Sequence, residues 1–385
     1  MFFGILTTAS GLGFGLFFGF LSGLIPSLHI NQIMPLASNF LTGFELYLAV
    51  LFGSILFICL SFIPAYFFMV PSDANYISVL PGQEYFQKGR AYSALVNTLL
   101  AILFSTILSA PFVALLLFYS TKIISIYKYL VPPVLILSLC FLLIKKTKNI
   151  FSVLVVIFAA GLGYICLRTT TVQNPLFVLV GGLFGLSSAI SLFYFKSEWV
   201  KQSTKVEIGK NKIKNGLLAN VLSLFVTFFP GLGSGFAAFI GQQLKLVKDK
   251  IDYLQIIGGI SISVTIFSFM NIYFTGKART GAAYYLPLEI PWYYTYLLCI
   301  AFVIVSVFIT WKIGKLFVTL GNRIGEKIKY VVPAILFVLA AITTNFFGIF
   351  IFILCGLCGF ICIASSNSRT LMMSAIIFPV LLFFI

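Results

Sequence analysis

Ionisable side chains are scarce in this chain of 385 residues. Only 9% of the residues are charged, Asp and Glu together number nine, and there is one histidine. A soluble domain has about a quarter of its residues charged, so a soluble surface and most soluble enzyme architectures are excluded. A single histidine excludes a multi-histidine metal site. We place the acids in loops or near helix ends, which excludes a buried chain of carboxylates as a proton relay.

Apolar residues are abundant instead. They make up 61% of the chain, with 44 phenylalanines, and the mean hydropathy is +1.11. At roughly 20 apolar residues per span, the length allows about ten to twelve membrane helices. The apolar runs are continuous, whereas barrel strands alternate in polarity over about ten residues. We therefore predict an all-α, polytopic integral membrane protein of the cytoplasmic membrane, with its N-terminal run retained as the first helix.

The net charge of +16 comes from 25 Lys and Arg residues. These residues gather in short loops beside apolar runs, mainly in 196–214 and 312–329. Loops of this kind face the cytoplasm, so the charge indicates orientation and not a nucleic-acid partner. Lys145, Lys146 and Lys148 are predicted to lie on the same side.

Two stretches interrupt apolar sequence with proline, glycine and polar residues at what should be membrane depth, 19–32 and 228–236. Proline removes a backbone donor, and non-helical backbone inside a membrane must be covered by protein or line a cavity. Each stretch is therefore predicted to be a broken or re-entrant helix. Pro26 and Pro230 lie about 200 residues apart, and a basic cluster of small residues follows each, at 88–94 and 276–282.

This repeated order of features predicts two transmembrane repeats, residues 1–195 and 215–385, joined by a basic cytoplasmic linker at 196–214. Matching interrupted segments in two halves are typical of secondary transporters built from inverted repeats. The substrate site of such transporters lies near the midplane, between the repeats.

A broken helix exposes unpaired N–H groups at one half-helix and C=O groups at the other, so it can hold an anion or a cation. The expected substrate-binding residues are those at or beside the two breaks. They are Pro26, Ser27, His29, Asn31, Gln32, Pro230, Gly231, Gly233, Ser234 and Gly235. The alternative is that the prolines and glycines only kink helices for packing.

A second set of residues is expected to attract the substrate or couple its transport to an ion: Asp73, Lys88, Arg90, Lys277 and Arg279. As alternatives, Asp73 is a turn residue, the four basic residues orient the protein or bind lipid headgroups, and His29 is a structural hydrogen-bonding residue. No phosphate loop, nucleophile elbow or zinc motif is present, so no catalytic or metal-binding residue and no cofactor are expected. Sodium or a proton is the expected coupling ion.

Several short motifs accompany the breaks, which are of the Gly-x-x-Pro-Gly-x-Gly type. They are Leu80-Pro81-Gly82, Lys88-Gly89-Arg90-Ala91, Ile257-Gly258-Gly259-Ile260, Ile266-Phe267-Ser268 and Ala278-Arg279-Thr280-Gly281-Ala282-Ala283. Together these features resemble the large membrane subunit of the tripartite tricarboxylate transporters, in particular its shorter archaeal branch. The resemblance covers residues 19 to 283.

The resemblance implies secondary transport of a carboxylate held by the two Pro-Gly loops, through Pro26, Ser27, Asn31, Pro230, Gly231, Gly233 and Ser234. Ser27 stands where the family usually has glycine, which leaves the substrate open. Bacterial members work with a small membrane subunit and a periplasmic binding protein. The partners considered are therefore an anionic substrate, membrane lipids, these two proteins and a second copy of the chain, but no nucleic acid.

The leading hypothesis is an ion-coupled carboxylate transporter that is not an enzyme. A second hypothesis is a translocase for a polyprenyl-phosphate lipid carrier, since a broken helix with a basic cluster also suits a phosphate. A third is a lipid-modifying membrane enzyme with His29 and Asp73 as acid and base, which requires both to reach one substrate.

Overall fold

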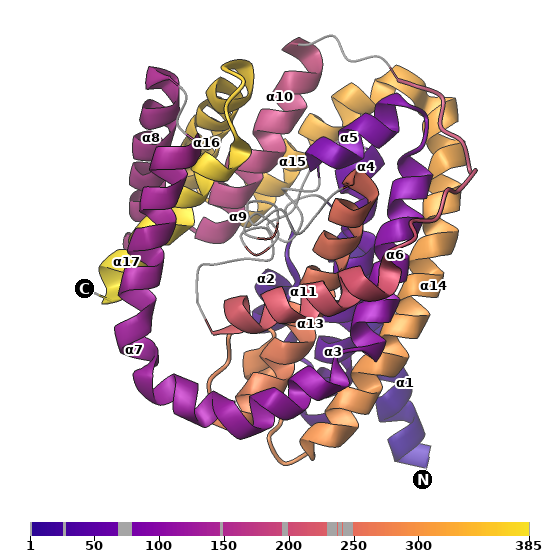
Figure 1. The fold of residues 1–385 in the computed structure, drawn as a ribbon. Helices are drawn as coiled ribbons and strands as arrows, with labels where there is room; N and C mark the ends of the chain where they lie inside the picture. Colours follow the sequence, from indigo (N-terminus) through magenta and orange to yellow (C-terminus); the bar gives the residue numbers. More distant parts are fainter. Residues whose placement is uncertain are drawn as a thin grey trace.

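A computed structural model describes residues 2–25, 28–67, 79–146, 149–194, 199–228, 237, 241 and 249–384. Within these ranges all regular secondary structure is helical (Figure 1). The predicted all-α fold class is confirmed.

The first half of the chain forms α1 (Phe2–Leu24), α2 (Ile30–Ala37), α3 (Gly43–Leu60), α4 (Phe62–Phe67), α5 (Val79–Gln87), α6 (Ala91–Ile107), α7 (Ala110–Lys146), α8 (Ile150–Arg168), α9 (Pro175–Val180), the π-helix η2 (Gly181–Leu186) and α10 (Ser187–Tyr194). The second half forms α11 (Lys212–Thr227), α13 (Lys250–Thr275), η3 (Ala283–Tyr285), α14 (Trp292–Ile324), η4 (Gly325–Lys327), α15 (Ile328–Thr343), α16 (Phe346–Ala364), η5 (Arg369–Met373) and α17 (Ser374–Phe384).

Six helical segments in the described part of the chain are long and apolar enough to cross a membrane: Leu6–Leu24, Gly43–Phe67, Ile150–Arg168, Lys250–Thr275, Trp292–Lys327 and Phe346–Ala364. A seventh is possible if Ala91–Ile107 and Ala110–Lys122, which meet at an angle of 54°, form one bent span. The predicted polytopic membrane protein is confirmed, and the total of ten to twelve segments stays a prediction.

Helices α1 and α3 pack closely through glycine. The glycine stripe on α1 consists of Gly11, Gly15, Gly19 and Gly23, one residue per turn. A Cβ atom at Gly11 would lie 2.8 Å from the carbonyl oxygen of Glu45, and one at Gly23 would lie 2.5 Å from the Cβ of Leu60. The two helices therefore run parallel, with backbones close enough that only glycine fits, as small-residue interfaces between membrane helices require.

The first predicted break lies beside the second half of α3. Helix α1 ends at Leu24, and a Cβ atom at Gly23 would lie 2.5 Å from the Cβ of Leu60, the last residue of α3. Helix α2 starts at Ile30 and leads back to the start of α3; a Cβ atom at Gly53 would lie 3.3 Å from the Cδ1 of Ile30. Gly53 lies ten residues beyond Gly43, where α3 begins, which is about 15 Å along a helix. A hydrocarbon core is about 30 Å thick, so α2 starts near mid-depth.

The corresponding helices of the second half run the opposite way. Asn215 near the start of α11 donates to Asp252 near the start of α13 at 2.8 Å, so these two helices are parallel to each other. Tyr47 at the start of α3 and Tyr273 at the end of α13 both bond to the hydroxyl of Thr295, at 2.8 and 2.9 Å. Helices α3 and α13 are therefore antiparallel.

Helices α8 and α16 form a similar antiparallel pair. Each has 19 residues and an asparagine N-cap, Asn149 or Asn345, whose side chain accepts a hydrogen bond from the backbone N–H three residues on. Asn367, which follows α16, donates to Asn149 at 3.2 Å, and Asn345 donates to the carbonyl of Thr171, which follows α8, at 2.6 Å. Each cap is thus held by the loop that leaves the other helix.

The helices form two groups (Figure 1). The first contains α1–α6, α11, α13 and α14, and the second contains α8–α10, η2 and α15–α17. The long helix α7 runs from α13 in the first group to α17 in the second. Each group contains helices from both predicted repeats, and the boundaries of those repeats stay a prediction.

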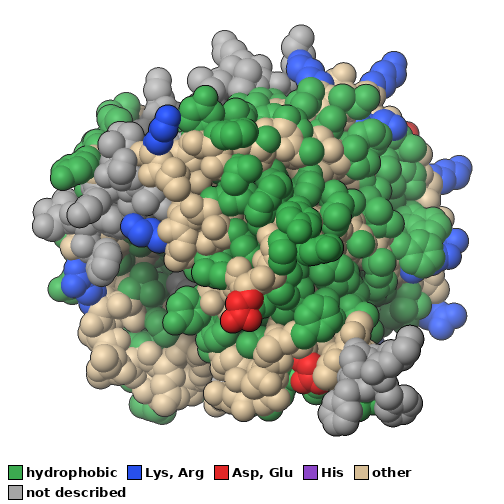
Figure 2. Space-filling model, turned by 90° about the horizontal axis from the view of Figure 1, so that it is seen from below, with side chains coloured by type: hydrophobic (Ala, Val, Ile, Leu, Met, Phe, Trp, Pro, Cys, Tyr) green, Lys and Arg blue, Asp and Glu red, His purple; other side chains and the backbone are tan. Residues whose placement is uncertain are grey.

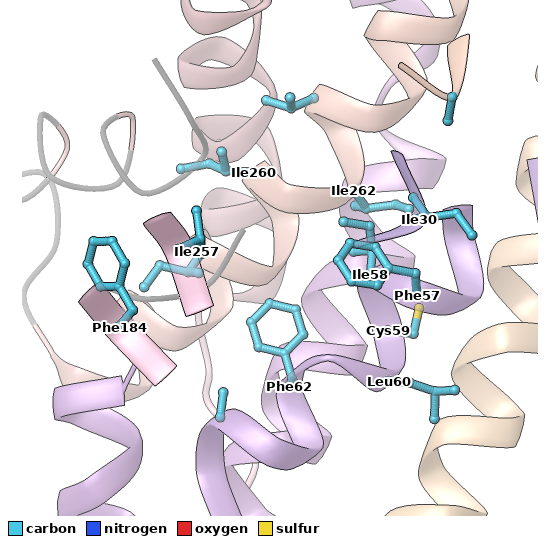
Figure 3. Close-up of a cluster of buried hydrophobic side chains, with 14 of the residues drawn as sticks. Ile30, Phe57, Ile58, Cys59, Leu60, Phe62, Phe184, Ile257, Ile260 and Ile262 are labelled. Atoms are coloured by element: carbon cyan, nitrogen blue, oxygen red, sulfur yellow. The ribbon is translucent and has the colours of Figure 1, made fainter. Parts of the chain in front are cut away.

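Buried apolar side chains fill the space beside the break (Figure 3). Ile30 of α2, Phe57 of α3, Phe62 of α4 and Ile257 of α13 belong to one cluster with Phe184 of η2, and each is at most 2% exposed. The cluster lies beside the break and contains residues of both helix groups.

Replacing Gly19 by alanine tests the glycine stripe. The new Cβ would lie 2.8 Å from the carbonyl oxygen of Gly53, so the helices must separate, and we expect a loss of roughly 1–3 kcal/mol of stability. The measurement is thermal unfolding in detergent. Gly13→Ala is the control, because nothing lies within 4 Å of a Cβ there. Equal melting temperatures for the two variants would contradict the close packing of α1 on α3.

Candidate functional site

The site is built around the amino-terminal end of α2, where the first break occurs. The Nδ1 atom of His29 accepts a hydrogen bond from the backbone N–H of Asn31 at 3.0 Å, as an N-cap residue does. Nδ1 is therefore the ring atom that serves as acceptor at this helix end. The ring packs on Phe57 with 4.4 Å between centroids. His29 thus fixes the start of α2 at mid-depth.

A loop from the second half of the chain covers this helix end. Helix α13 ends at Gly276, whose φ of +68° turns the chain back. Asn271 then donates to the carbonyl of Lys277 at 3.3 Å, and the hydroxyls of Thr280 and Ser268 lie 3.3 Å apart. The loop after α13 therefore folds back beside the last turns of that helix instead of leaving the molecule.

Asn31 and this loop are in direct contact. The Oδ1 atom of Asn31 accepts a hydrogen bond from the backbone N–H of Ala282 at 3.0 Å, between residues 251 positions apart. The structure thus brings the first break together with the cluster 276–282. Arg279 is partly buried and Lys277 is exposed. Asn271, which the sequence reasoning missed, has a buried Oδ1 without a hydrogen-bond partner in the described structure.

Other expected site residues lie outside the described residues: Pro26, Ser27, Asp73, Pro230, Gly231, Gly233, Ser234, Gly235 and the side chain of Gln32. Helix α11 ends at Thr227, just before the second predicted break. The roles of these residues stay predictions.

Lys88 and Arg90 lie at the other end of α13 from Lys277. Lys250, where α13 starts, forms an ion pair with Glu84 of α5, the helix that leads to Lys88. Arg90 pairs with Glu207 at 2.7 Å, with the two side chains 47% and 62% exposed. An ion pair this exposed contributes little to stability. The immediate partner of Arg90 is the linker, and a role in attracting substrate stays a prediction.

The predicted linker is described from residue 199 to residue 214, and its last three residues belong to α11. Residues 199–210 form an extended segment that we call the strap (Figure 1). Gln202, 4% exposed, accepts from the backbone N–H of Ala91 at 3.0 Å and donates to the carbonyl of Phe86 at 2.9 Å. Its own backbone N–H and C=O both bond to the side chain of Asn322 in α14, at 2.9 Å. The strap therefore fastens α5 and α6 to the end of α14.

The glycine of the Lys-Gly-x-Ala motif permits this docking. Gly89 has a φ of +69°, and a Cβ atom there would lie 2.7 Å from the carbonyl oxygen of Lys201. The backbone N–H of Ser203 donates to the carbonyl of Gly89 at 2.8 Å. The pKa of Tyr85, which lies beside the strap, is raised mainly by burial and to a smaller extent by the Glu207 carboxylate.

A buried polar network anchors the far end of the strap. Asn97 of α6 accepts from the backbone N–H of Gly209 at 2.8 Å and donates to the carbonyl of Glu207 at 2.7 Å. Gln255 of α13 donates to the same Asn97 oxygen at 3.1 Å. Asn97 and Gln255 are isolated amide residues inside apolar runs of the sequence, and this pattern could have identified the network.

The same network corrects one expectation about the acids. Asp252 lies in the first turn of α13, inside a candidate span, and is only 6% exposed, although we expected no span to contain a buried acid. Asn211 and Asn215 donate to its two oxygens at 3.0 and 2.8 Å. These donors and the positive end of the helix dipole make the burial tolerable.

The two ends of the molecule differ in charge. The strap, the end of α14 and the end of α7 at Lys146 lie at one end, as predicted for the basic loops (Figure 1). The opposite end shows mainly hydrophobic side chains, with acidic side chains near its middle and basic ones toward its edge (Figure 2). By the positive-inside rule we expect the strap to face the cytoplasm, and this stays a prediction.

Comparison with known proteins identifies the family of this chain. A sequence model described as "Tripartite tricarboxylate transporter TctA family" matches residues 5–374. The chain belongs to this family. An uncharacterised protein of the archaeon Methanocaldococcus jannaschii is 26% identical to this TctA-family chain over 279 residues, which is 70% of each chain. No solved structure matches it.

Membership of the TctA family confirms the resemblance seen in the sequence. The protein is therefore a multi-pass protein of the cell membrane in a family of secondary transporters for tricarboxylate-type substrates. This is a transporter family, which agrees with a protein that is not an enzyme.

Substitution of His29 tests its role as a cap. In His29→Asn the side-chain oxygen sits near the position of Nδ1 and can still accept from Asn31, whereas in His29→Gln it sits near Nε2. We expect His29→Gln and His29→Ala to lose about 1 kcal/mol of stability and His29→Asn to lose much less. Unfolding in detergent measures the differences. A greater loss in His29→Asn than in His29→Gln would show that the cap is not the important contact.

Removal of the Gln202 amide tests the strap. Gln202→Ala leaves the N–H of Ala91 buried without this partner, while the carbonyl of Phe86 still accepts from the backbone N–H of Gly89. We therefore expect a loss of roughly 1–3 kcal/mol for the one unpaired group. Lys201→Ala is the matched control, since Lys201 is the exposed neighbour. Limited proteolysis measures strap release. Equal cleavage in both variants would show that the strap is not held by this side chain.

Proposed function

We propose that this TctA-family protein is an ion-coupled secondary transporter that moves a carboxylate anion across the cytoplasmic membrane, with its site between the two helix breaks. The observation that carries the proposal is the bond between Asn31 and the backbone of Ala282. Here a helix starts at mid-depth and meets a non-helical loop from the other half of the chain. Non-helical backbone at such a depth is tolerated only where protein buries it or where it lines a cavity.

The chemistry of this meeting point suits an anion. The amino-terminal end of α2 carries the positive end of the helix dipole. The loop that faces it supplies backbone N–H groups and the guanidinium of Arg279. Half-helix amino termini of this kind hold substrate carboxylates in transporters with broken helices. We propose that Pro26, Ser27 and Gln32 complete the site on the α2 side.

The second break is proposed to supply the other wall. Pro230, Gly231, Gly233, Ser234 and Gly235 follow α11 directly in sequence, and their lack of bulky side chains allows a close approach of backbone to ligand. Sodium or a proton is the proposed coupling ion, with Asp73 as a candidate contact.

The opposite helix directions support inverted repeats at 1–195 and 215–385, with 196–214 as the linker. Helices α1 and α3 run against α11 and α13, and the asparagine caps of α8 and α16 face opposite ends. In such a protein, alternating access follows from the movement of one helix group against the other around the site. A small membrane subunit or an extracytoplasmic binding protein would then act in delivery of the substrate.

Substitution of Asn31 tests the proposed site. Asn31→Ala removes the oxygen that holds the Ala282 N–H, so the loop loses its position over α2, and we expect uptake to fall by roughly tenfold or more, as when a positioning contact of a few kcal/mol is lost. The assay is uptake of labelled mono-, di- and tricarboxylates into proteoliposomes, under a sodium gradient or a pH gradient.

Ser38→Ala is the control, because Ser38 is a half-buried residue just beyond the other end of α2 whose hydroxyl donates to the nearby carbonyl of Pro35. Full uptake by Asn31→Ala would contradict the site. Uptake of no carboxylate by the wild-type protein, together with transfer of a prenyl phosphate between leaflets, would favour the lipid-carrier alternative.

A further inference from the structure

One charged side chain lies among the helices of the second group without a charged partner. Arg369, the first residue of η5, is partly buried between α16 and α17. Its Nη1 donates to the hydroxyl of Ser188 in α10 at 2.9 Å. The ion pairs found among the described residues are Arg90–Glu207 and Lys250–Glu84, and neither involves it.

Hydrogen bonds fix both the guanidinium of Arg369 and the loop that carries it. Asn367 is tied to Asn149 and to Ser152 of α8, at 3.2 and 2.9 Å. Ser188, which accepts from Arg369, itself donates to the carbonyl of Phe184 in the π-helix η2 at 2.5 Å. The loop thus places Arg369 between α10 and the α16–α17 hairpin. Arginine has five N–H donors, and one neutral hydroxyl satisfies only one of them.

A cation in this position requires an anion. A charge in a membrane protein is costly unless it is paired or lies in a water-filled cavity. The planar fork of a guanidinium matches the oxygens of a phosphate and binds them bidentately. The amino-terminal end of α17 and its preceding η5 also favours negative charge.

The depth of Arg369 fits a lipid headgroup. Ser188 lies six residues before the last residue of α10, Tyr194, which is about 9 Å along the helix axis. The headgroup layer of each leaflet is roughly 5–8 Å thick, so Arg369 lies near the boundary between headgroups and acyl chains. This is the end of the molecule that we place in the cytoplasm, where the leaflet carries anionic lipids.

The outer surface of the neighbouring helices is apolar. Large side chains are exposed there, Phe193 and Tyr194 on α10 at 42% and 65%, and Leu357 and Ile361 on α16 at 47% and 46%. The acyl chains of a lipid suit such a surface, whereas a small soluble carboxylate does not.

We infer that Arg369 binds the phosphate of an anionic lipid headgroup from the cytoplasmic leaflet, where it lies between α10 and the α16–α17 hairpin. The bound lipid braces the hairpin against the π-helix through Ser188. This site is separate from the proposed carboxylate site and does not depend on it.

The test compares lipids on the purified, delipidated full chain. Dioleoylphosphatidylglycerol should raise the melting temperature more than dioleoylphosphatidylcholine does, and native mass spectrometry should show it retained. In Arg369→Gln the affinity for phosphatidylglycerol should fall roughly tenfold or more, as expected for loss of a charge-assisted hydrogen bond. Arg369→Lys keeps the charge but loses the planar fork of donors. Its affinity for phosphatidylglycerol should lie between those of the wild type and Arg369→Gln.

Arg168→Gln is the matched control, because Arg168 is an exposed arginine at the other end of the same helix group and bonds to the carbonyl of Leu382. Unchanged phosphatidylglycerol affinity in Arg369→Gln would overturn the inference. Equal stabilisation of the wild type by millimolar inorganic phosphate or citrate would also overturn it, because the site would then take a free anion.

A purely structural role for Arg369 gives a different result. In that case Arg369→Gln and Ser188→Ala lower the melting temperature equally in both lipids, and the difference between the lipids persists. If Arg369→Gln does not fold, Arg369→Lys and the wild-type lipid comparison still decide, and a wild type that does not distinguish the two lipids refutes the lipid site.

Discussion

The hydrocarbon core of a membrane contains no water to satisfy backbone N–H and C=O groups, and this constraint shapes the whole molecule. Where α2 starts at mid-depth, the chain needs partners for the exposed amino-terminal end of this helix. His29 caps one backbone donor, and Asn31 takes the N–H of Ala282 from a loop that returns into the protein. The break is thus tolerated because the other half of the chain covers it. The same requirement gives the site its character, since groups that cover a broken helix are also able to hold a ligand.

At the end of the molecule that carries the strap, the same constraint is met in a different way. The strap is extended and has no helical bonds of its own, so side chains supply its partners, among them Gln202, Asn97 and Asn322. Because α6, α13 and α14 all belong to the first helix group, the strap reinforces that group as a unit. The second group has its own polar ties, such as Asn367 with Asn149. Movement between the groups is then compatible with both sets of bonds.

The sequence was informative wherever a rule is local. Proline and glycine at 19–32 located the first break, and the polar run before Arg369 located the final hairpin, because both depend on backbone chemistry at one place. It could not show that Arg90 pairs with Glu207 or that Asp252 lies beneath the strap, since such contacts depend on which helices become neighbours. The glycine stripe on α1 has the spacing of a packing face, but its partner α3 became known only from the structure.

The paired caps of α8 and α16 give the second group a symmetry that bears on transport. Each asparagine caps its own helix and is held by the loop that leaves the other, so the pair makes equivalent contacts at both membrane faces. When equivalent contacts exist on both faces, a state open to one side can be built from the same interactions as a state open to the other. Two such states differ little in free energy, and a ligand or ion gradient of a few kcal/mol is then enough to shift the population between them.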